Sequence, residues 1–248
     1  MNKRKELVTG RRNVFEALQS GSVVELWIMR GSRGKIEKVV EQGKEQGVPI
    51  KWLPKEKFRE WTGQASVHQG IAALVEAYRY GTWEGFEHSR KKSPPTEMVL
   101  LLDHLQDPHN LGALIRTAEA AGVGEIIIPK DRSVEVNATV RKVSAGAAEW
   151  VSVIKVTNLV QTIHSLQQMG YWIYGASEEG ACPYYQVNWE ARSGLVLGGE
   201  GKGLSRLVKE NCDQLVYIPM FGRVSSLNVS VSGALLMFEY RRRVEGWQ

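Results

Sequence analysis

The second half of the chain constrains the fold most strongly, because apolar segments and amphipathic helical segments alternate strictly from Met98 onward. The predicted strands are 99–102, 125–128, 151–154, 171–176, 195–197 and 215–218. The predicted helices are 111–121, 137–145, 159–169, 205–212 and, at the end, about 228–243. This order predicts an α/β domain with a parallel sheet that carries helices on both faces.

The first 77 residues predict a separate and smaller α/β unit. Its helical segments are 13–19 and 35–46, and its strands are 23–29, 49–53 and 71–75. Between residues 78 and 97 the pattern fails. Gly81, Gly85, the basic run Arg90-Lys91-Lys92 and the Ser93-Pro94-Pro95 break suit a linker rather than a core element. We therefore expect two domains, at 1–77 and 98–248, joined by a linker at 78–97.

Composition excludes several classes of protein. Lys and Arg outnumber Asp and Glu by 32 to 27, and a net charge of +5 is compatible with a polyanionic partner. No run approaches the roughly 18 apolar residues that span a bilayer, and the N-terminus lacks the apolar segment of a secretory signal. We expect a cytoplasmic protein without membrane contact. The distant Cys182 and Cys212 suit two reduced thiols, and the five histidines form no helical pair, so no metal is expected.

The glycines that would bind a nucleotide lie late in the chain. The segment after the first strand of the large domain, 102–110, contains no glycine, which disfavours an ordinary dinucleotide or methyltransferase site. A glycine-rich loop appears instead at 197–205, directly after a predicted strand. Val196 and Gly203 occupy positions where a Walker A loop requires Gly and Ser or Thr, so the best candidate for ATP hydrolysis is lost.

Three separated segments are informative when they are considered together. They are Asp107-Pro108-His109-Asn110-Leu111-Gly112-Ala113-Leu114-Ile115-Arg116-Thr117-Ala118, the loop Gly198–Gly203, and Ile218-Pro219-Met220-Phe221-Gly222-Arg223-Val224-Ser225-Ser226-Leu227-Asn228-Val229-Ser230. In this order they resemble the three signature motifs of the TrmH-like branch of the SPOUT methyltransferases. The resemblance covers about residues 98 to 243.

The resemblance implies a fold, a cofactor and a reaction. The expected fold is a SPOUT domain with a deep trefoil knot, an exception to the rule that protein chains are unknotted. The expected cofactor is S-adenosylmethionine, bound in the knot largely by backbone groups, with Gly198, Ile218 and Leu227 as its contacts. Glycine permits such close approach, and apolar side chains would enclose the adenine.

The resemblance also implies the catalytic residues. Arg116 would be the central one, contacting the target phosphate and ribose. Asn110 belongs to the same motif, and Glu200 would orient Asn110 or Arg116. Ser226 and Asn228 match polar positions of the third motif, although a Ser-Ser-Leu-Asn run also suits a helix N-cap, and Asn228 can serve both purposes.

The N-terminal region carries a shorter resemblance. Residues 10–18, Gly-Arg-Arg-Asn-Val-Phe-Glu-Ala-Leu, and 68–71, His-Gln-Gly-Ile, are similar to the auxiliary RNA-binding domain of the bacterial 23S rRNA guanosine 2'-O-methyltransferases of the RlmB type. This implies structured RNA, 23S rRNA in particular, as partner. A tRNA methyltransferase and a non-catalytic RNA-binding assembly factor remain alternatives. The candidates for RNA contact are Lys3, Arg4, Arg11, Arg12, Arg30, Arg33, Arg90–Lys92, Trp27, Trp52 and Trp61.

Relatives of this kind form homodimers, so a homodimer is expected here. In the last predicted helix Val229, Ala234, Leu235 and Phe238 include the one-turn spacings of a buried face. Met237 and Phe238 are also candidates for the dimer interface. The sequence alone does not separate the interface from the core.

Overall fold

The computed structural model describes residues 5–32, 36–63, 68–90 and 96–246. The chain divides into two compact units, one made of residues 1–79 with 136–142 and the other of residues 80–135 with 143–248. The short helix α6 (Ala138–Val143) falls almost wholly in the segment that groups with the first unit. None of the helices in the described ranges combines the length and the apolar character that crossing a membrane requires.

The N-terminal unit is built on a four-stranded sheet with the order β1-β4-β2-β3. Its strands are β1 (Lys5–Thr9), β2 (Val23–Met29), β3 (Ile50–Leu53) and β4 (Ile71–Glu76). The helices α1 (Arg11–Gln19) and α2 (Glu37–Glu45) share one apolar core with the sheet, whereas α3 (Lys55–Thr62) shares a second, smaller one. The sequence predicted β2, β3, β4, α1 and α2 but not β1 or α3.

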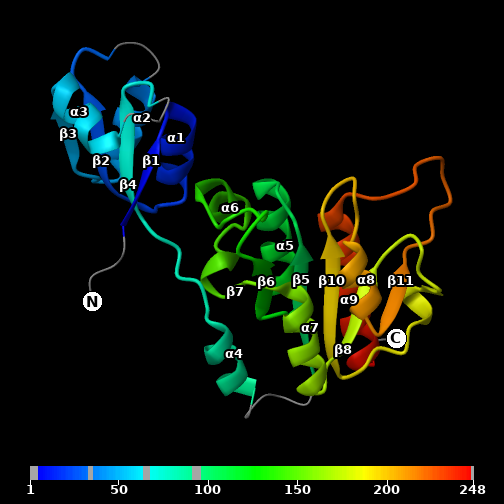
Figure 1. Cartoon of the computed structure of the whole chain (residues 1–248). Helices are drawn as coiled ribbons and strands as arrows, with labels where there is room; N and C mark the ends of the chain where they lie inside the picture. Colours follow the sequence, from blue (N-terminus) through cyan, green and yellow to red (C-terminus); the bar gives the residue numbers. More distant parts are fainter. Residues whose placement is uncertain (1–4, 33–35, 64–67, 91–95, 247–248) are drawn as a thin grey trace. The chain divides into compact units, whose positions relative to one another are not determined.

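A seven-stranded sheet forms the centre of the larger unit, in the order β7-β6-β5-β10-β8-β11-β9, and all of its ladders are parallel (Figure 1). Its strands are β5 (Glu97–Asp103), β6 (Glu125–Pro129), β7 (Ser152–Val156), β8 (Trp172–Ala176), β9 (Cys182–Pro183), β10 (Arg192–Gly198) and β11 (Gln214–Tyr217). The parallel α/β sheet expected from the alternating pattern is confirmed. Strand β9, only two residues long, was not predicted.

Helices cover both faces of this sheet. On one face α4 (Trp83–Arg90), α7 (Leu159–Gln168) and α8 (Arg206–Asn211) pack over Leu101, Ile127 and Val196. On the other face α5 (Pro108–Ala120) and α9 (Val229–Val244) pack against each other and over Leu197. Val196 and Leu197 therefore point to opposite faces, as neighbouring residues of a strand do.

Helix α4 corrects the expected linker. Phe86 is only 4% exposed and belongs to the main apolar core of the larger unit. Arg90 forms ion pairs with Glu97, at 2.5 Å, and with Glu125. A helix of eight residues gains little from its own propensity, so its stability comes from this packing, which the interspersed Gly85 and the following prolines concealed in the sequence.

Helix α9 buries a different face from the one that the sequence predicted. Gly233, Leu236, Met237 and Tyr240 are buried, whereas Leu235 and Phe238 are 37% and 43% exposed. The reason is Gly233, at which an added Cβ atom would lie 2.5 Å from the Leu114 side chain. Because this position has no side chain, α9 approaches α5 closely along the glycine face.

Truncation of Phe86 tests whether α4 is part of the core. Phe86→Ala is expected to lower the free energy of unfolding by about 3 kcal/mol or more, because a large buried side chain is lost and a cavity remains. Urea denaturation measures this change, and Glu87→Ala, at an exposed position on the same helix, serves as the control. Equal stabilities of the two variants would show that α4 is a surface linker after all.

Candidate functional site

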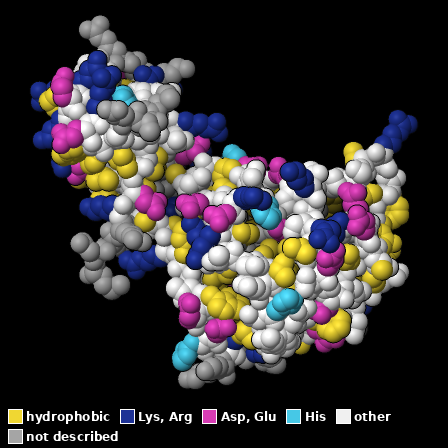
Figure 2. All heavy atoms as spheres, in the orientation of Figure 1, with side chains coloured by type: hydrophobic (Ala, Val, Ile, Leu, Met, Phe, Trp, Pro, Cys, Tyr) yellow, Lys and Arg dark blue, Asp and Glu magenta, His cyan; other side chains and the backbone are white. Residues whose placement is uncertain are grey.

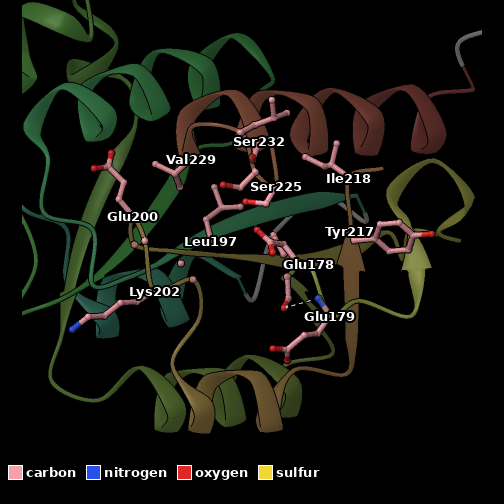
Figure 3. A pocket seen from close by; sticks show the side chains of 18 of the residues that line it. Glu178, Glu179, Leu197, Glu200, Lys202, Tyr217, Ile218, Ser225, Val229 and Ser232 are labelled. Atoms are coloured by element: carbon pink, nitrogen blue, oxygen red, sulfur yellow. Dashed lines mark hydrogen bonds between the residues drawn. The ribbon is translucent and has the colours of Figure 1, made fainter. Parts of the chain in front are cut away.

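A cavity of the larger unit lies at the carboxyl ends of neighbouring parallel strands. It has a volume of about 750 Å³ and is lined by the ends of β8, β10 and β11 and by the segment that leads into α9 (Figure 3). Strand order reverses next to it, between β5 and β10, because β6 and β7 lie on one side of β5 while β10, β8 and β11 lie on the other. Open parallel sheets bind ligands at such switch points, and the volume suits a small molecule.

The glycine-rich loop after β10 forms one wall of the cavity. It folds back on itself, with the Gly203 amide donating to the Gly199 carbonyl at 3.1 Å. An added Cβ atom at Gly198 would lie 2.0 Å from the Gly203 carbonyl carbon, and one at Gly199 would lie 2.6 Å from the His104 carbonyl oxygen. Both contacts are with backbone, which cannot move aside. Glycine is therefore required for this loop to close.

Asp103, which the sequence analysis did not select, holds the loop closed from the neighbouring strand. Its side chain is 1% exposed, and its Oδ2 atom accepts a hydrogen bond from the Ser205 amide at 2.6 Å. Its backbone carbonyl accepts one from the Gly199 amide at 2.9 Å. The available signal was a carboxylate that directly follows the apolar run 98–102, since a buried charge needs partners.

A polar cluster joins the three motifs beside the cavity. The Asn110 amide group donates to the Glu200 carboxylate, and the Asn228 amide group donates to the Asn110 side-chain oxygen at 3.0 Å. Asn110 also lies 3.3 Å from the Asp107 carboxylate, to which it donates. Segments about 90 and 118 residues apart in the sequence are thus linked by side-chain hydrogen bonds. Of the two partners proposed for Glu200, the structure pairs it with Asn110.

Two residues of this region also begin helices. Asp107 caps α5, because its carboxylate accepts from the His109 amide at 2.9 Å, and Asn228 caps α9 by accepting from the Ser230 amide at 2.9 Å. A cap satisfies backbone amides that have no partner within the helix. Asn228 therefore serves both as a cap and as a member of the polar cluster, the double role that the sequence had left open.

The remaining site residues fall into two groups. Gly198, Ile218, Ser226 and Leu227 line the cavity. Arg116 does not line it, and this exposed side chain has no hydrogen bond or ion pair within the described part of the chain. The structure therefore assembles the expected cofactor contacts and the polar cluster but leaves Arg116 outside them.

Cys212 and His109, two other groups that could react, do not line the cavity. Burial raises the pKa of Cys212 to about 12, so its thiol stays protonated at neutral pH and does not act as a nucleophile. His109 is exposed at the start of α5. Among residues 5–32, 36–63, 68–90 and 96–246, no three or more His, Cys, Asp or Glu side chains gather as metal ligands would.

Comparison with protein families identifies the class of protein. Residues 97–238 match the model of the SpoU rRNA Methylase family, and residues 7–81 match that of the RNA 2'-O ribose methyltransferase substrate-binding domain. The first match alone covers more than half of the chain. The chain therefore belongs to the SpoU rRNA methylase family and is an RNA methyltransferase.

Individual relatives agree with this family. The chain is 42% identical over 240 residues to a Staphylococcus haemolyticus protein described as a TrmH family tRNA/rRNA methyltransferase, with 96% of each chain covered. It is 39% identical over 247 residues to YacO of Bacillus subtilis, described in the same way, with 98% of each covered.

Solved structures share the fold of the whole chain. The SpoU methyltransferase AviRb from Streptomyces viridochromogenes, in complex with AdoMet, matches with a TM-score of 0.64 at 21% identity, covering 98% of this chain and 92% of that one. An RNA methyltransferase of the TrmH family from Porphyromonas gingivalis matches with a TM-score of 0.59 at 26% identity, covering 96% and 90%.

The double role of Asn228 gives a prediction. Asn228→Ala is expected to destabilise the protein by about 1 kcal/mol through loss of the cap, whereas Asn228→Asp retains an acceptor for the Ser230 amide. Neither variant can donate to Asn110. We therefore expect Asn228→Asp to keep near-native stability in thermal unfolding. A loss as large as that of Asn228→Ala would show that the link to Asn110, not the cap, carries the stability.

Proposed function

We propose that this protein transfers a methyl group from S-adenosylmethionine to a ribose 2'-hydroxyl of structured RNA. The observation that carries the proposal is the hydrogen-bonded meeting of Asn110, Glu200 and Asn228 beside a cavity of cofactor size. The family and the substrate-binding domain match support the same reaction, and AviRb, a structural neighbour, binds AdoMet.

The cavity residues fit this cofactor. Gly198 and Gly199 expose backbone where a side chain would clash, so a ligand can approach the loop closely. Ile218, Met220 and Leu227 supply apolar surface on which an adenine ring would rest. We assign Gly198, Ile218 and Leu227 as the adenine contacts. The trefoil knot through which the family binds the cofactor is likewise part of this proposal.

The protein contributes positioning more than covalent chemistry. S-adenosylmethionine supplies an activated methyl group, and transfer requires an in-line approach of the ribose hydroxyl. A guanidinium is always protonated in proteins, so Arg116 is suited to hold the target phosphate and ribose rather than to act as a base. Its exposure and its lack of a partner among the described residues leave it available to RNA. Glu200 and Asn228 hold Asn110, and Ser226 lies at the cavity beside them.

The N-terminal unit favours 23S rRNA as substrate, with a guanosine as the target by resemblance to the rRNA enzymes. Figure 2 shows Lys and Arg side chains gathered over this unit, interspersed with acidic ones. Arg12 and Arg30 are exposed and Arg11 is half-buried, whereas Trp27 is buried; Trp52 and Trp61 are exposed. Lys3, Arg4, Arg33, Lys91 and Lys92 lie outside the described residues.

A tRNA guanosine remains the alternative substrate, since the catalytic motifs are common to rRNA and tRNA methyltransferases. With either substrate, the proposed location of the protein is the cytoplasm.

A homodimer is the second part of the proposal. Val231, Leu235 and Phe238 form an exposed apolar stripe along α9, on the side away from its buried face. Their spacing of four and three residues places them on one side of the helix. A second copy of the chain would cover this stripe. Met237, the other interface candidate, is fully buried within its own subunit and therefore belongs to the core.

Removal of the arginine tests the reaction. Arg116→Ala is expected to lower the rate of methyl transfer to unmodified rRNA by about 100-fold or more, as loss of a positioned charge commonly does, while binding of S-adenosylhomocysteine stays unchanged. Glu119→Ala, at an exposed position on the same helix, is the control. Unchanged turnover in Arg116→Ala would remove this residue from the mechanism, and no turnover in the parent protein would favour a non-catalytic RNA-binding factor.

A charge on the exposed stripe tests the dimer. Phe238→Glu is expected to convert the protein to monomers at concentrations where the parent is dimeric, because burying an unpaired carboxylate is unfavourable. Sedimentation equilibrium measures the mass. Leu207→Glu, at a residue that is 54% exposed on α8 across the sheet, is the matched control. A dimeric Phe238→Glu variant would place the interface elsewhere.

A further inference from the structure

The Glu178 carboxylate lines the cavity but does not belong to the polar cluster of Asn110, Glu200 and Asn228. It follows β8, and its side chain lies in the cavity between Leu197 and Ile218, below Ser225 (Figure 3). The carboxylate forms no hydrogen bond or ion pair with any residue in the described ranges. An exposed carboxylate in a cavity that binds a polar molecule is a candidate for ligand contact.

The neighbouring Glu179 provides a contrast. Its side chain extends away from Glu178 (Figure 3). Its carboxylate forms an ion pair with Lys209 of α8 at 2.9 Å. Two successive acidic residues of one turn thus differ: Glu179 is paired with a lysine, whereas Glu178 has no such partner in the described part of the chain. This gives the chain its own matched control for any experiment on Glu178.

The backbone around Glu178 is held against β11. The Ser177 amide donates to the Val216 carbonyl at 2.9 Å, and the Gly180 amide donates to the Ser177 carbonyl at 3.0 Å. An added Cβ atom at Gly180 would lie 2.6 Å from the Val216 carbonyl carbon, so the turn packs directly on the strand. The turn that carries Glu178 therefore lies beside Val216, which is two residues before Ile218, the assigned adenine contact.

We propose that Glu178 binds the 2',3'-diol of the cofactor's ribose, an inference that rests on the proposed cofactor. In S-adenosylmethionine the ribose is attached directly to the adenine, so the group next to an adenine at Ile218 and Leu227 is this sugar. One carboxylate accepts hydrogen bonds from two adjacent hydroxyls, and bonds to a charged acceptor are stronger than those between neutral groups.

Ligand titrations by calorimetry test this assignment. Glu178→Ala is expected to weaken binding of S-adenosylhomocysteine by about tenfold or more, since a hydrogen bond to a charged group contributes at least 1.4 kcal/mol, about tenfold in affinity. Binding of 5'-methylthioadenosine, which retains the diol but lacks the amino acid, should fall by the same factor. Glu178→Gln, which keeps one acceptor oxygen, should fall between, and Glu179→Ala should bind like the parent protein.

A diol-free analogue separates this contact from a general effect on the cavity. For 5'-methylthioadenosine without its two hydroxyls, Glu178→Ala should bind as the parent does. Loss of affinity for S-adenosylhomocysteine alone would assign Glu178 to the ammonium group and overturn the proposal, as would an equal loss for the diol-free analogue or no loss for any ligand. Failure of the parent protein to bind S-adenosylhomocysteine would refute the proposed cofactor itself, and the assignment of Glu178 with it.

Discussion

The site depends on the closure of one loop by one buried carboxylate. Parallel pairing of β5 with β10 places Gly198 opposite Asp103, and the Asp103 side chain then accepts the Ser205 amide at the far end of the loop. A charged acceptor in a buried position strengthens this bond and makes its loss costly. Because the loop is closed there, Glu200 reaches Asn110, and the loop lines the cavity.

Chemistry in this protein is assembled at a sheet edge rather than within one motif. Asn110 comes from the first turn of α5, Glu200 from the loop after β10 and Asn228 from the cap of α9. Gly233 lets α9 pack against α5, which brings Asn228 to Asn110, whereas Glu200 reaches Asn110 through the closed loop after β10. Packing of the core and geometry of the site are therefore coupled, and a change in the contact of α9 with α5 would shift the position of Asn228.

Sequence patterns predicted much of this arrangement because it is local. An apolar run predicts strand β2, and a capping residue predicts the start of α9. The alternation of strands and helices along the chain predicts the parallel sheet. Helix α4 was missed because it is stabilised by the packing of Phe86 against strands that are distant in the sequence. The prediction of which face of α9 is buried was wrong, because a glycine rather than an apolar side chain makes the closest contact. Asp103 was missed for a similar reason, since its partner lies 102 positions away. The knot and the catalytic and cofactor-binding roles of the site residues, Arg116 among them, stay predictions.

The most direct test of the account is the chemical identity of the methylated product. The protein would be incubated with S-adenosylmethionine carrying a labelled methyl group and with unmodified 23S rRNA and tRNA, and the RNA would then be digested to nucleosides. The account predicts label in a 2'-O-methylated nucleoside, 2'-O-methylguanosine from 23S rRNA. Label on a base, or no transfer to either RNA, would contradict it, and label in tRNA ribose would retain the reaction while changing the substrate.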